Sequence, residues 1–362
     1  MAKDHNNERT PVRISRSIRL CTLLAAVVSV ALLSGCAGAA PGSGSGSRAA
    51  SGGSNGGANG AFPVTITSAL GDAVIPSKPK RVVTIGWGAA DTLIALGTTP
   101  VGMEAATWGG DKDHYYPWVR KAIQKRGDAL PKTFNVYPEI DMEKILALAP
   151  DLILAPQSGL TAAQYASLSK IAPTVAYPHK PWLTSWSDEI AIVGKAMGQG
   201  AKAGQLTRSI RHTLAKTAAA HPEFKGVDFA YIYAAEPGQL QLYQAGDPRV
   251  DLISGLGLTL DPSVAKVPLT SGTFTSTVGL ERADLLKNVD VLFTWFNDPA
   301  NEKTIEAQPL YAQIPAVRRG SYVPNVDNQL AMASSMITPL SVPWALDKYV
   351  PMITRAVAKA SQ

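Results

Sequence analysis

Aromatic and amide side chains follow several short apolar runs of this sequence, at the points where β-strands would end. In open α/β sheets, ligands bind beyond the carboxyl ends of the strands. Aromatic side chains offer a large contact face there at little entropy cost. The candidate ligand contacts chosen by this rule are Trp87, Trp108, Gln157, Ser158, Tyr243, Phe274, Trp295 and, in the loop 327–329, Asn328. For each tryptophan, packing in the core is the alternative to ligand contact.

The stretch around Trp87 also suggests a different chemistry. Val82–Ile85 run into Gly86-Trp87-Gly88, and helix-forming residues follow. A strand, a G-x-G turn and a helix open a dinucleotide-binding unit. The third glycine is missing, however, because Asp91 stands there and would place a carboxylate near the pyrophosphate. A secreted oxidoreductase that binds NAD is therefore a minor alternative.

Thiol and metal chemistry find little support. The two cysteines, Cys21 and Cys36, both lie in the first 36 residues, in an N-terminal segment that we expect to be removed or lipidated, as argued below from its apolar run. No thiol then remains for a disulfide, a nucleophile or a metal site. The remaining histidines are His114, His179, His212 and His221. They show neither H-x-H nor H-E-x-x-H spacing, so no bare metal site and no resident cofactor are expected.

The candidate residues require an α/β scaffold to bring them together. After residue 62, apolar strands alternate with helical segments, a pattern that predicts a largely parallel sheet. Residues 185–222 contain no strand-like run and are predicted to be helical, and the alternation then restarts. "DMEKILALAPDLILAP" is echoed by "GLERADLLKNVDVLFTW", and "LSKIAPTVAYP" by "LYAQIPAVRRGSYVP". We therefore expect two Rossmann-like lobes, 62–184 and 223–362, joined by a long rigid connector helix, with a ligand cleft between them. A final helix is predicted at roughly 340–359.

The N-terminus predicts export and anchoring. Basic residues precede the apolar run "LCTLLAAVVSVALL", which is too short to span a bilayer and is typical of a signal peptide. "LSGC" resembles a bacterial lipobox, so residues 1–35 are expected to be cleaved and Cys36 to be lipidated. Residues 36–61 then form a flexible Gly/Ser/Ala tether. Removing residues 1–35 lowers the net charge from +6 to +3, which does not favour binding to nucleic acid.

Several segments in order resemble a known family. "PKRVVTIGWGAADTLIALGTTPVGM", "PDLILAPQSGLT", "LSKIAPTVAYPHKPWLTSW", "DPRVDLISGLGL" and "TPLSVPWALDKYVP" are similar to the substrate-binding lipoproteins of iron–siderophore ABC importers, above all actinobacterial ones. The wider group includes ferrichrome-, heme- and vitamin B12-binding proteins. The resemblance implies a monomeric, non-enzymatic protein on the extracytoplasmic face of the cell membrane. It would capture a ferric siderophore, or alternatively heme or a corrinoid, and deliver it to a dimeric ABC permease.

The resemblance also assigns roles to four further residues. Arg249 lies in a D-P-R context shared with related sequences and would direct its guanidinium at ligand oxygens. Tyr137 occupies the stretch where ferrichrome-type relatives carry an arginine, and it is included as a candidate ligand contact. Glu143 and Glu281 each open a predicted helix at the corresponding place in their lobe, where a carboxylate is favoured by the helix dipole. The resemblance implies that they dock on arginines of the permease.

Overall fold

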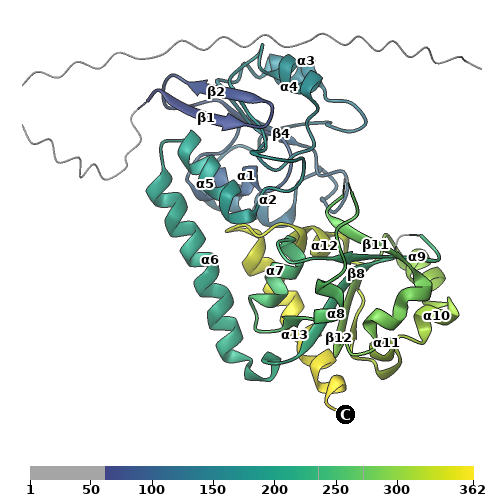
Figure 1. The fold of residues 1–362 in the computed structure, drawn as a ribbon. Coiled ribbons are helices and arrows are strands. Elements are labelled where there is room, and N and C mark those ends of the chain that lie inside the picture. Colours follow the sequence, from purple (N-terminus) through teal and green to yellow (C-terminus); the bar gives the residue numbers. More distant parts are fainter. Residues whose placement is uncertain (1–61, 235, 272) are drawn as a thin grey trace, which may run out of the picture. The chain divides into compact units, whose positions relative to one another are not determined.

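The computed structural model of the chain describes residues 62–234, 236–271 and 273–362 (Figure 1). The predicted signal peptide, the lipidation of Cys36 and the tether fall outside the described residues. Within the described part, none of the helices combines the length and the apolar character that crossing a membrane would require.

The first lobe is built on a five-stranded parallel sheet with the strand order β5-β4-β3-β6-β7. Every residue of the central strands β3 and β6 is buried, as expected for a parallel sheet covered on both faces. The strands are β3 (Val82–Thr84), β4 (Gly102–Glu104), β5 (Lys132–Phe134), β6 (Leu152–Leu154) and β7 (Thr174–Val175). The helices between and after them are α1 (Ala89–Ala95), α2 (Pro117–Arg126), α3 (Met142–Ala147), α4 (Ala162–Leu168) and α5 (Trp186–Ala196).

An antiparallel hairpin precedes this sheet. Its strands are β1 (Val64–Ser68) and β2 (Gly71–Ile75), paired along their whole length. Both strands alternate between exposed and buried residues, the pattern of strands with one face on the core. They pack against β7 and so cover one edge of the parallel sheet.

The second lobe has a mixed sheet with the strand order β11-β9-β8-β12-β13, and β10 pairs with β8. Strands β8, β12 and β13 are parallel, whereas β9 is antiparallel to both β8 and β11. The strands are β8 (Asp228–Tyr233), β9 (Gln239–Tyr243), β10 (Thr259–Leu260), β11 (Thr275–Gly279), β12 (Val291–Trp295) and β13 (Tyr322–Val323). The helical elements are η1 (Pro222–Phe224), α7 (Pro248–Ser254), α8 (Pro262–Ala265), η2 (Leu280–Leu286), α9 (Pro299–Glu306), α10 (Pro309–Ala312), α11 (Pro315–Arg319), α12 (Asn328–Ser335) and α13 (Ser341–Ala360). The last of these is the final helix that the sequence predicts.

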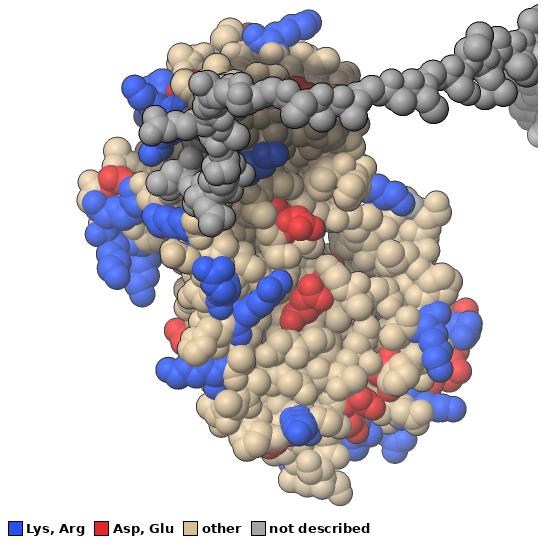
Figure 2. Space-filling view, turned by 60° about the vertical axis from the view of Figure 1, so that its left-hand side comes forward, with Lys and Arg blue, Asp and Glu red and all other residues tan. Residues whose placement is uncertain are grey.

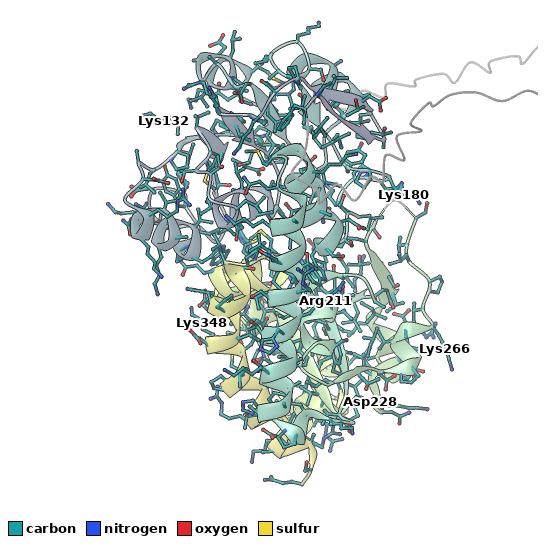
Figure 3. The ribbon with its side chains drawn as sticks, turned by 90° about the vertical axis from the view of Figure 1, so that its left-hand side faces the viewer. Lys132, Lys180, Arg211, Asp228, Lys266 and Lys348 are labelled. Atoms are coloured by element: carbon teal, nitrogen blue, oxygen red, sulfur yellow. The ribbon has the colours of Figure 1, made fainter. Side chains whose placement is uncertain are left out.

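A single long helix, α6 (Gly200–Ala220), joins the two lobes (Figures 1 and 3). The α5 helix, in contrast, packs against α1 and β1 of the first lobe as well as against α6. Its Trp186 ring lies 5.6 Å from the guanidinium of Arg211, which Figure 3 shows on α6. The covalent connection between the sheets is therefore one continuous helix of 21 residues, roughly 30 Å long.

The echo between the two halves is visible in the strand order. The β6 strand lies between β3 and β7 in the first sheet, and β12 lies between β8 and β13 in the second. The helices before β6 and β12 differ, however. Asp141 caps α3 by accepting a hydrogen bond from the Lys144 amide, whereas Gly279 has no side chain to cap η2. The segment that begins at Glu281 is accordingly a kinked 3₁₀ helix rather than the α-helix expected from the sequence.

The largest cluster of buried apolar side chains crosses from one lobe to the other. It runs from α1 and α5 through the inner face of α6 to β8, α12 and α13. Two smaller clusters each lie within one lobe.

Figure 2 shows lysine and arginine side chains in small groups with acidic side chains among them, rather than one continuous basic surface, on the face that it presents.

Candidate ligand-binding cleft

The turn after β3 presents Trp87 between two glycines in the left-handed region. Gly86 and Gly88 both have φ of 83°, and a Cβ at Gly86 would collide with the carbonyl oxygen of Gln157. The Trp87 amide donates to that same oxygen at 3.0 Å. The turn is therefore tied to the end of β6, and the Trp87 ring lies 5.2 Å from the ring of Trp182.

Gln157 uses its side-chain amide to position the loop that carries Trp182. Its Nε2 donates to the Trp182 carbonyl at 3.1 Å, and its Oε1 accepts from the Thr184 amide at 2.9 Å. The neighbouring Ser158 is buried, and its hydroxyl donates to the Ala155 carbonyl at 2.8 Å. Gln157 still lines the cleft, whereas the Ser158 hydroxyl is bonded within its own turn.

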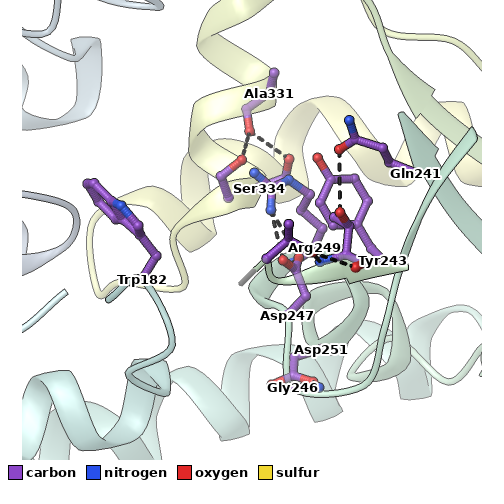
Figure 4. Close-up of polar contacts among 12 residues, drawn as sticks. Trp182, Gln241, Tyr243, Gly246, Asp247, Arg249, Asp251, Ala331 and Ser334 are labelled. Atoms are coloured by element: carbon purple, nitrogen blue, oxygen red, sulfur yellow. Dashed lines mark hydrogen bonds and ion pairs between the residues drawn. The ribbon is translucent and has the colours of Figure 1, made fainter. Parts of the chain in front are cut away.

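In the second lobe, Arg249 is paired with its own helix cap (Figure 4). The arginine is only 4% exposed, and its Nη1 donates to both carboxylate oxygens of Asp247 at 3.1 and 2.9 Å. Its guanidinium lies 4.3 Å from the Tyr243 ring centre, and its Nε has no partner among the described residues. Burial lowers the pKa of Arg249, but the Asp247 charge and hydrogen bond together with Tyr243 and Tyr231 more than offset this, so the net shift is upward. In this geometry the guanidinium contacts Asp247 rather than an open cleft.

Three aromatic residues contact Tyr243, and a fourth ring, that of Tyr233, stacks on one of them and extends this wall. Trp295, at the end of β12, donates from Nε1 to the Tyr243 hydroxyl at 3.2 Å and stacks on Tyr233 at 3.9 Å. Phe274 stacks on Tyr243 at 6.4 Å, and Tyr231 meets its edge at 5.5 Å. Burial raises the pKa of Tyr243 to about 12, so its hydroxyl stays neutral.

Direct contacts join the two walls. The rings of Trp108 in the first lobe and Trp295 in the second lie 5.3 Å apart, nearly edge to face. Asp91 of α1 accepts hydrogen bonds at 2.7 Å from Trp118 Nε1 and from the Thr338 hydroxyl, which precedes α13. Burial raises the pKa of Asp91 to about 6. The rings of Trp118 and Trp344 also meet across the interface, at 5.2 Å. Among the described residues, the lobes are thus joined by these two ring pairs and by the buried Asp91–Thr338 hydrogen bond.

Asn328 of the second lobe lies against the first lobe. It opens α12, and its carbonyl oxygen lies against Gly109, where a Cβ would come within 2.7 Å. Its side-chain Oδ1 is buried without a partner among the described residues. An unbonded buried acceptor of this kind suits a ligand donor.

Residues of both walls enclose a cavity of about 250 Å³. Gln157, Trp182 and Thr184 line it from the first lobe, and Asp247 and Phe274 from the second. Two smaller cavities, of about 30 and 20 Å³, lie beside Trp87. Six of the residues chosen by the strand-end rule therefore lie at the lobe interface: Trp87, Trp108, Gln157, Phe274, Trp295 and Asn328.

The other predicted residues lie elsewhere. Tyr137 is 88% exposed and lines none of these three cavities. Glu143 and Glu281 are exposed in the first turns of α3 and η2, one in each lobe. Cys36 is outside the described residues. The described residues contain no group of three or more side chains that would hold a metal ion.

Sequence reasoning missed the buried carboxyl groups of the first wall. Glu189 of α5 accepts from the Thr92 hydroxyl at 3.0 Å, and burial together with the nearby Asp91 charge raises its pKa to about 8. Glu104 accepts from the Gly86 amide at 2.7 Å, and burial raises its pKa as well. A signal existed: Glu189 falls on the apolar face of α5 with Ile190 and Val193, where an acid is unusual.

The two-lobed architecture is shared with a known protein family. A family model described as "Periplasmic binding protein" matches residues 82–323, about two thirds of the chain. The chain belongs to this family. The match starts at β3 and ends at β13, so that it includes both sheets and α6.

Individual relatives agree with this assignment. The putative ABC transporter substrate-binding lipoprotein YhfQ of Bacillus subtilis is 37% identical over 113 residues, which cover 31% of this chain and 32% of that protein. The ferric enterobactin-binding periplasmic protein FepB of Escherichia coli O6:H1 is 26% identical, over 71% of this chain and 82% of that protein. The crystal structure of Streptococcus pneumoniae PiaA in complex with ferrichrome is 30% identical, with a TM-score of 0.75, over 82% of this chain and 99% of that one.

Proposed function

We propose that this chain is an extracytoplasmic solute-binding protein that captures a ferric siderophore between its lobes and delivers it to an ABC permease. The observation that carries this proposal is the aromatic lining of both cleft walls in a member of the periplasmic binding protein family. Ferric siderophores have a bulky, partly apolar organic shell, which indole and phenol rings fit. The relatives named for ferric enterobactin and the structure with ferrichrome support the ligand class.

The structure has a narrow cleft. The cavity of about 250 Å³ between the walls is below the ~300–1,000 Å³ of sites that bury a drug-sized ligand. A ferric siderophore therefore requires the walls to move apart at contacts such as Trp108–Trp295 and Asp91–Thr338. Because α6 is continuous, we expect a small hinge motion rather than a wide closure.

A binding titration tests the proposal. Tryptophan fluorescence is recorded against ferric hydroxamate, catecholate and carboxylate siderophores, their iron-free forms, heme and cobalamin. We expect saturable quenching by one class of ferric siderophore. The Trp87→Ala variant should weaken that binding by about tenfold or more, because a stacking ring is lost. Leu310→Ala on α10, at an exposed apolar side chain that lines none of the three cavities, is the control. Saturation by heme or cobalamin alone would reject the siderophore.

Delivery to a permease is the second part of the proposal. Glu143 and Glu281 are exposed, one in each lobe, and would meet basic residues of a dimeric permease. The charge-reversed double variant Glu143→Lys/Glu281→Lys should abolish iron uptake by cells while the affinity for the ferric siderophore stays unchanged. A variant with weakened siderophore binding would contradict this role. The corresponding change at Glu302, also acidic and in the second lobe, is the control.

Anchoring completes the proposal. Lipidation of Cys36 would hold a monomer at the outer face of the membrane through the tether 36–61. Mass spectrometry of the membrane fraction should find a mature protein that begins at Cys36 and carries a diacylglyceryl group on it. A membrane-bound protein whose Cys36 carries no lipid would contradict the anchor. We assign no catalytic reaction to the chain.

A further inference from the structure

One carboxyl group at the base of the cleft has no counter-charge. Glu189 is only 3% exposed and lines the cavity of about 20 Å³ between the lobes. Its Oε2 is held by the Thr92 hydroxyl, but its Oε1 is buried with no hydrogen-bond partner among the described residues. None of the ion pairs in the described part of the chain includes Glu189. A buried polar atom left in this state requires an explanation.

The surroundings of Glu189 favour a positive charge. Trp87 and Trp186 line the same cavity, and indole rings attract cations through their π faces. The Arg211 guanidinium already lies near the ring of Trp186. Of the two indole rings that line this cavity, Trp87 is therefore the one that remains to contact a cation from the cleft. Trp87 also lines the adjoining cavity, which reaches Asp91 and Glu104. Three carboxyl groups therefore gather around this tryptophan, and no lysine or arginine lines either cavity.

The second wall contributes neutral groups at this point. Pro248, Ser335 and Thr338 face the cavity from the second lobe. The nearest charged residues on that side, Asp247 and Arg249, neutralise each other in their own ion pair. Asp91 of α1 is the titratable group whose charge acts on Glu189. A cation that enters from the cleft would thus meet oxygen acceptors and the Trp87 ring, while Arg211, which lies against Trp186, does not line the cavity.

We propose that Glu189 and Trp87 form a subsite for a primary ammonium group carried by the bound siderophore, so that the protein prefers cationic ferric siderophores to neutral ones. This inference rests on the proposed function and adds the charge class of its ligand. An ammonium group has three N–H donors, and Glu189 Oε1, Gln157 and Ser335 offer oxygen acceptors around the cavity.

Proton release accompanies this recognition. Burial and the Asp91 charge raise the pKa of Glu189 to about 8, so the empty site holds a proton near neutral pH. An ammonium group beside the carboxylate favours its charged form and lowers its pKa. Binding of a cationic siderophore should therefore release up to one proton, while a neutral siderophore should release none at this site.

Matched ligands make the test. Ferrioxamine B, a hydroxamate chelate with one free primary amine, is compared by calorimetry with its N-acetylated form. Ferric catecholate and carboxylate chelates are made with and without the same amine arm, so that whichever class binds is tested. The intact protein should bind the amine form about tenfold or more tightly than the acetylated form, as expected for a charge-assisted contact with a buried carboxylate. Titrations in two buffers of different ionisation enthalpy should show the released proton.

The variant Glu189→Gln keeps the side-chain size and an acceptor for Thr92 while it removes the charge. It should bind both forms with equal affinity and release no proton. Glu302→Gln in α9, which lines neither cavity, is the matched control and should keep the preference. If Glu189→Gln does not fold, as judged by its thermal unfolding, the ligand pair and the proton count on the intact protein decide the question.

The outcomes separate the two proposals. Equal affinity of the intact protein for the amine and acetylated forms, or a preference that survives in Glu189→Gln, overturns the ammonium subsite and leaves siderophore capture intact. Failure of every ferric chelate to bind overturns both. Equally tight binding of pentylamine without a chelate would overturn the assignment of the ammonium group to a siderophore.

Discussion

The two walls of the cleft resemble each other in aromatic residues and differ in how they hold buried charge. Each presents a tryptophan at the carboxyl end of a central strand, Trp87 after β3 and Trp295 at the end of β12. The first wall buries carboxyl groups held by hydroxyl, indole and amide donors, without a cation. The second wall buries an arginine together with its own carboxylate.

This difference follows from the two sheets. In the all-parallel first sheet, helices α1 and α5 supply the acids from their buried faces. In the mixed second sheet, the antiparallel strand β9 leads directly into the segment that carries Asp247 and Arg249. A carboxyl group can be buried alone by taking up a proton, whereas an arginine stays charged and needs a counter-ion. The first wall is thus left able to respond to a cation and to pH.

The largest expected effect is on the free energy of unfolding, and it distinguishes the paired carboxyl group of Asp247 from the unpaired one of Glu189. Asp247→Asn keeps the cap of α7 but leaves the Arg249 charge buried alone, so the free energy of unfolding should fall by about 3–5 kcal/mol. Glu189→Gln makes the equivalent change in the first wall and should leave stability at pH 8 equal or higher. Urea denaturation of both variants measures this. If both variants lost a similar free energy of unfolding, the two walls would not differ in how they hold buried charge.

Two glycines, one in each wall, extend the comparison to the backbone. Gly86 and Gly246 both have positive φ, of 83° and 91°, but a Cβ collides with Gln157 only at Gly86, and nothing lies near Gly246. Gly86→Ala should therefore cost about 3 kcal/mol or more, and Gly246→Ala about 1 kcal/mol. Thermal unfolding at one pH gives both values. Equal costs would show that the turn at Trp87 adapts more freely than its contacts indicate.

The pH dependence of stability should come from the first wall. The pKa values of Glu189, about 8, and Asp91, about 6, exceed those of the unfolded chain, so the folded state holds more protons between pH 4 and pH 8. The free energy of unfolding should then decrease as pH rises through this range, because the folded state must release protons that the unfolded state has already lost. Glu189→Gln should remove most of the slope and Glu302→Gln none. A steeper slope in Glu189→Gln would contradict this origin.

The smallest effect concerns a neutral hydrogen bond in the second wall. Tyr243→Phe removes the acceptor for Trp295 Nε1 and should cost about 1 kcal/mol of stability. Tyr137→Phe, at an exposed side chain, should change stability by less than about 0.5 kcal/mol. Chemical denaturation compares the two. A Tyr243→Phe loss as large as that of Asp247→Asn would mean that the aromatic wall, rather than the ion pair, holds this lobe together.

The fold was predictable because its signals are local and repeated. Strand–helix alternation predicted both lobes, and the absence of strands in 185–222 predicted the helical connection that α6 makes. The strand-end rule found Trp87 and Trp295 because it depends only on sheet topology. The 3₁₀ form of η2 was missed, since it depends on the absence of a cap at Gly279.

The buried pairings were beyond the reach of the sequence. Asp91 and Thr338 are 247 positions apart and meet only through the approach of the two lobes. The D-P-R motif drew attention to Arg249, but its burial against Asp247 is a matter of side-chain direction, which sequence spacing does not give. Glu189 stood out only as an acid on an apolar helix face. The sequence thus predicts which residues lie at the cleft, but only the structure shows which buried charges are paired there.

The Trp108–Trp295 pair should give a spectroscopic signal that depends on the separation of the two lobes. Two indoles whose centres lie 5.3 Å apart couple their electronic transitions, and the coupling falls steeply with separation. Because one ring belongs to each lobe, parting of the lobes should erase the resulting couplet in the circular dichroism spectrum. The opening of this cleft can therefore be timed in the unlabelled protein, with light alone.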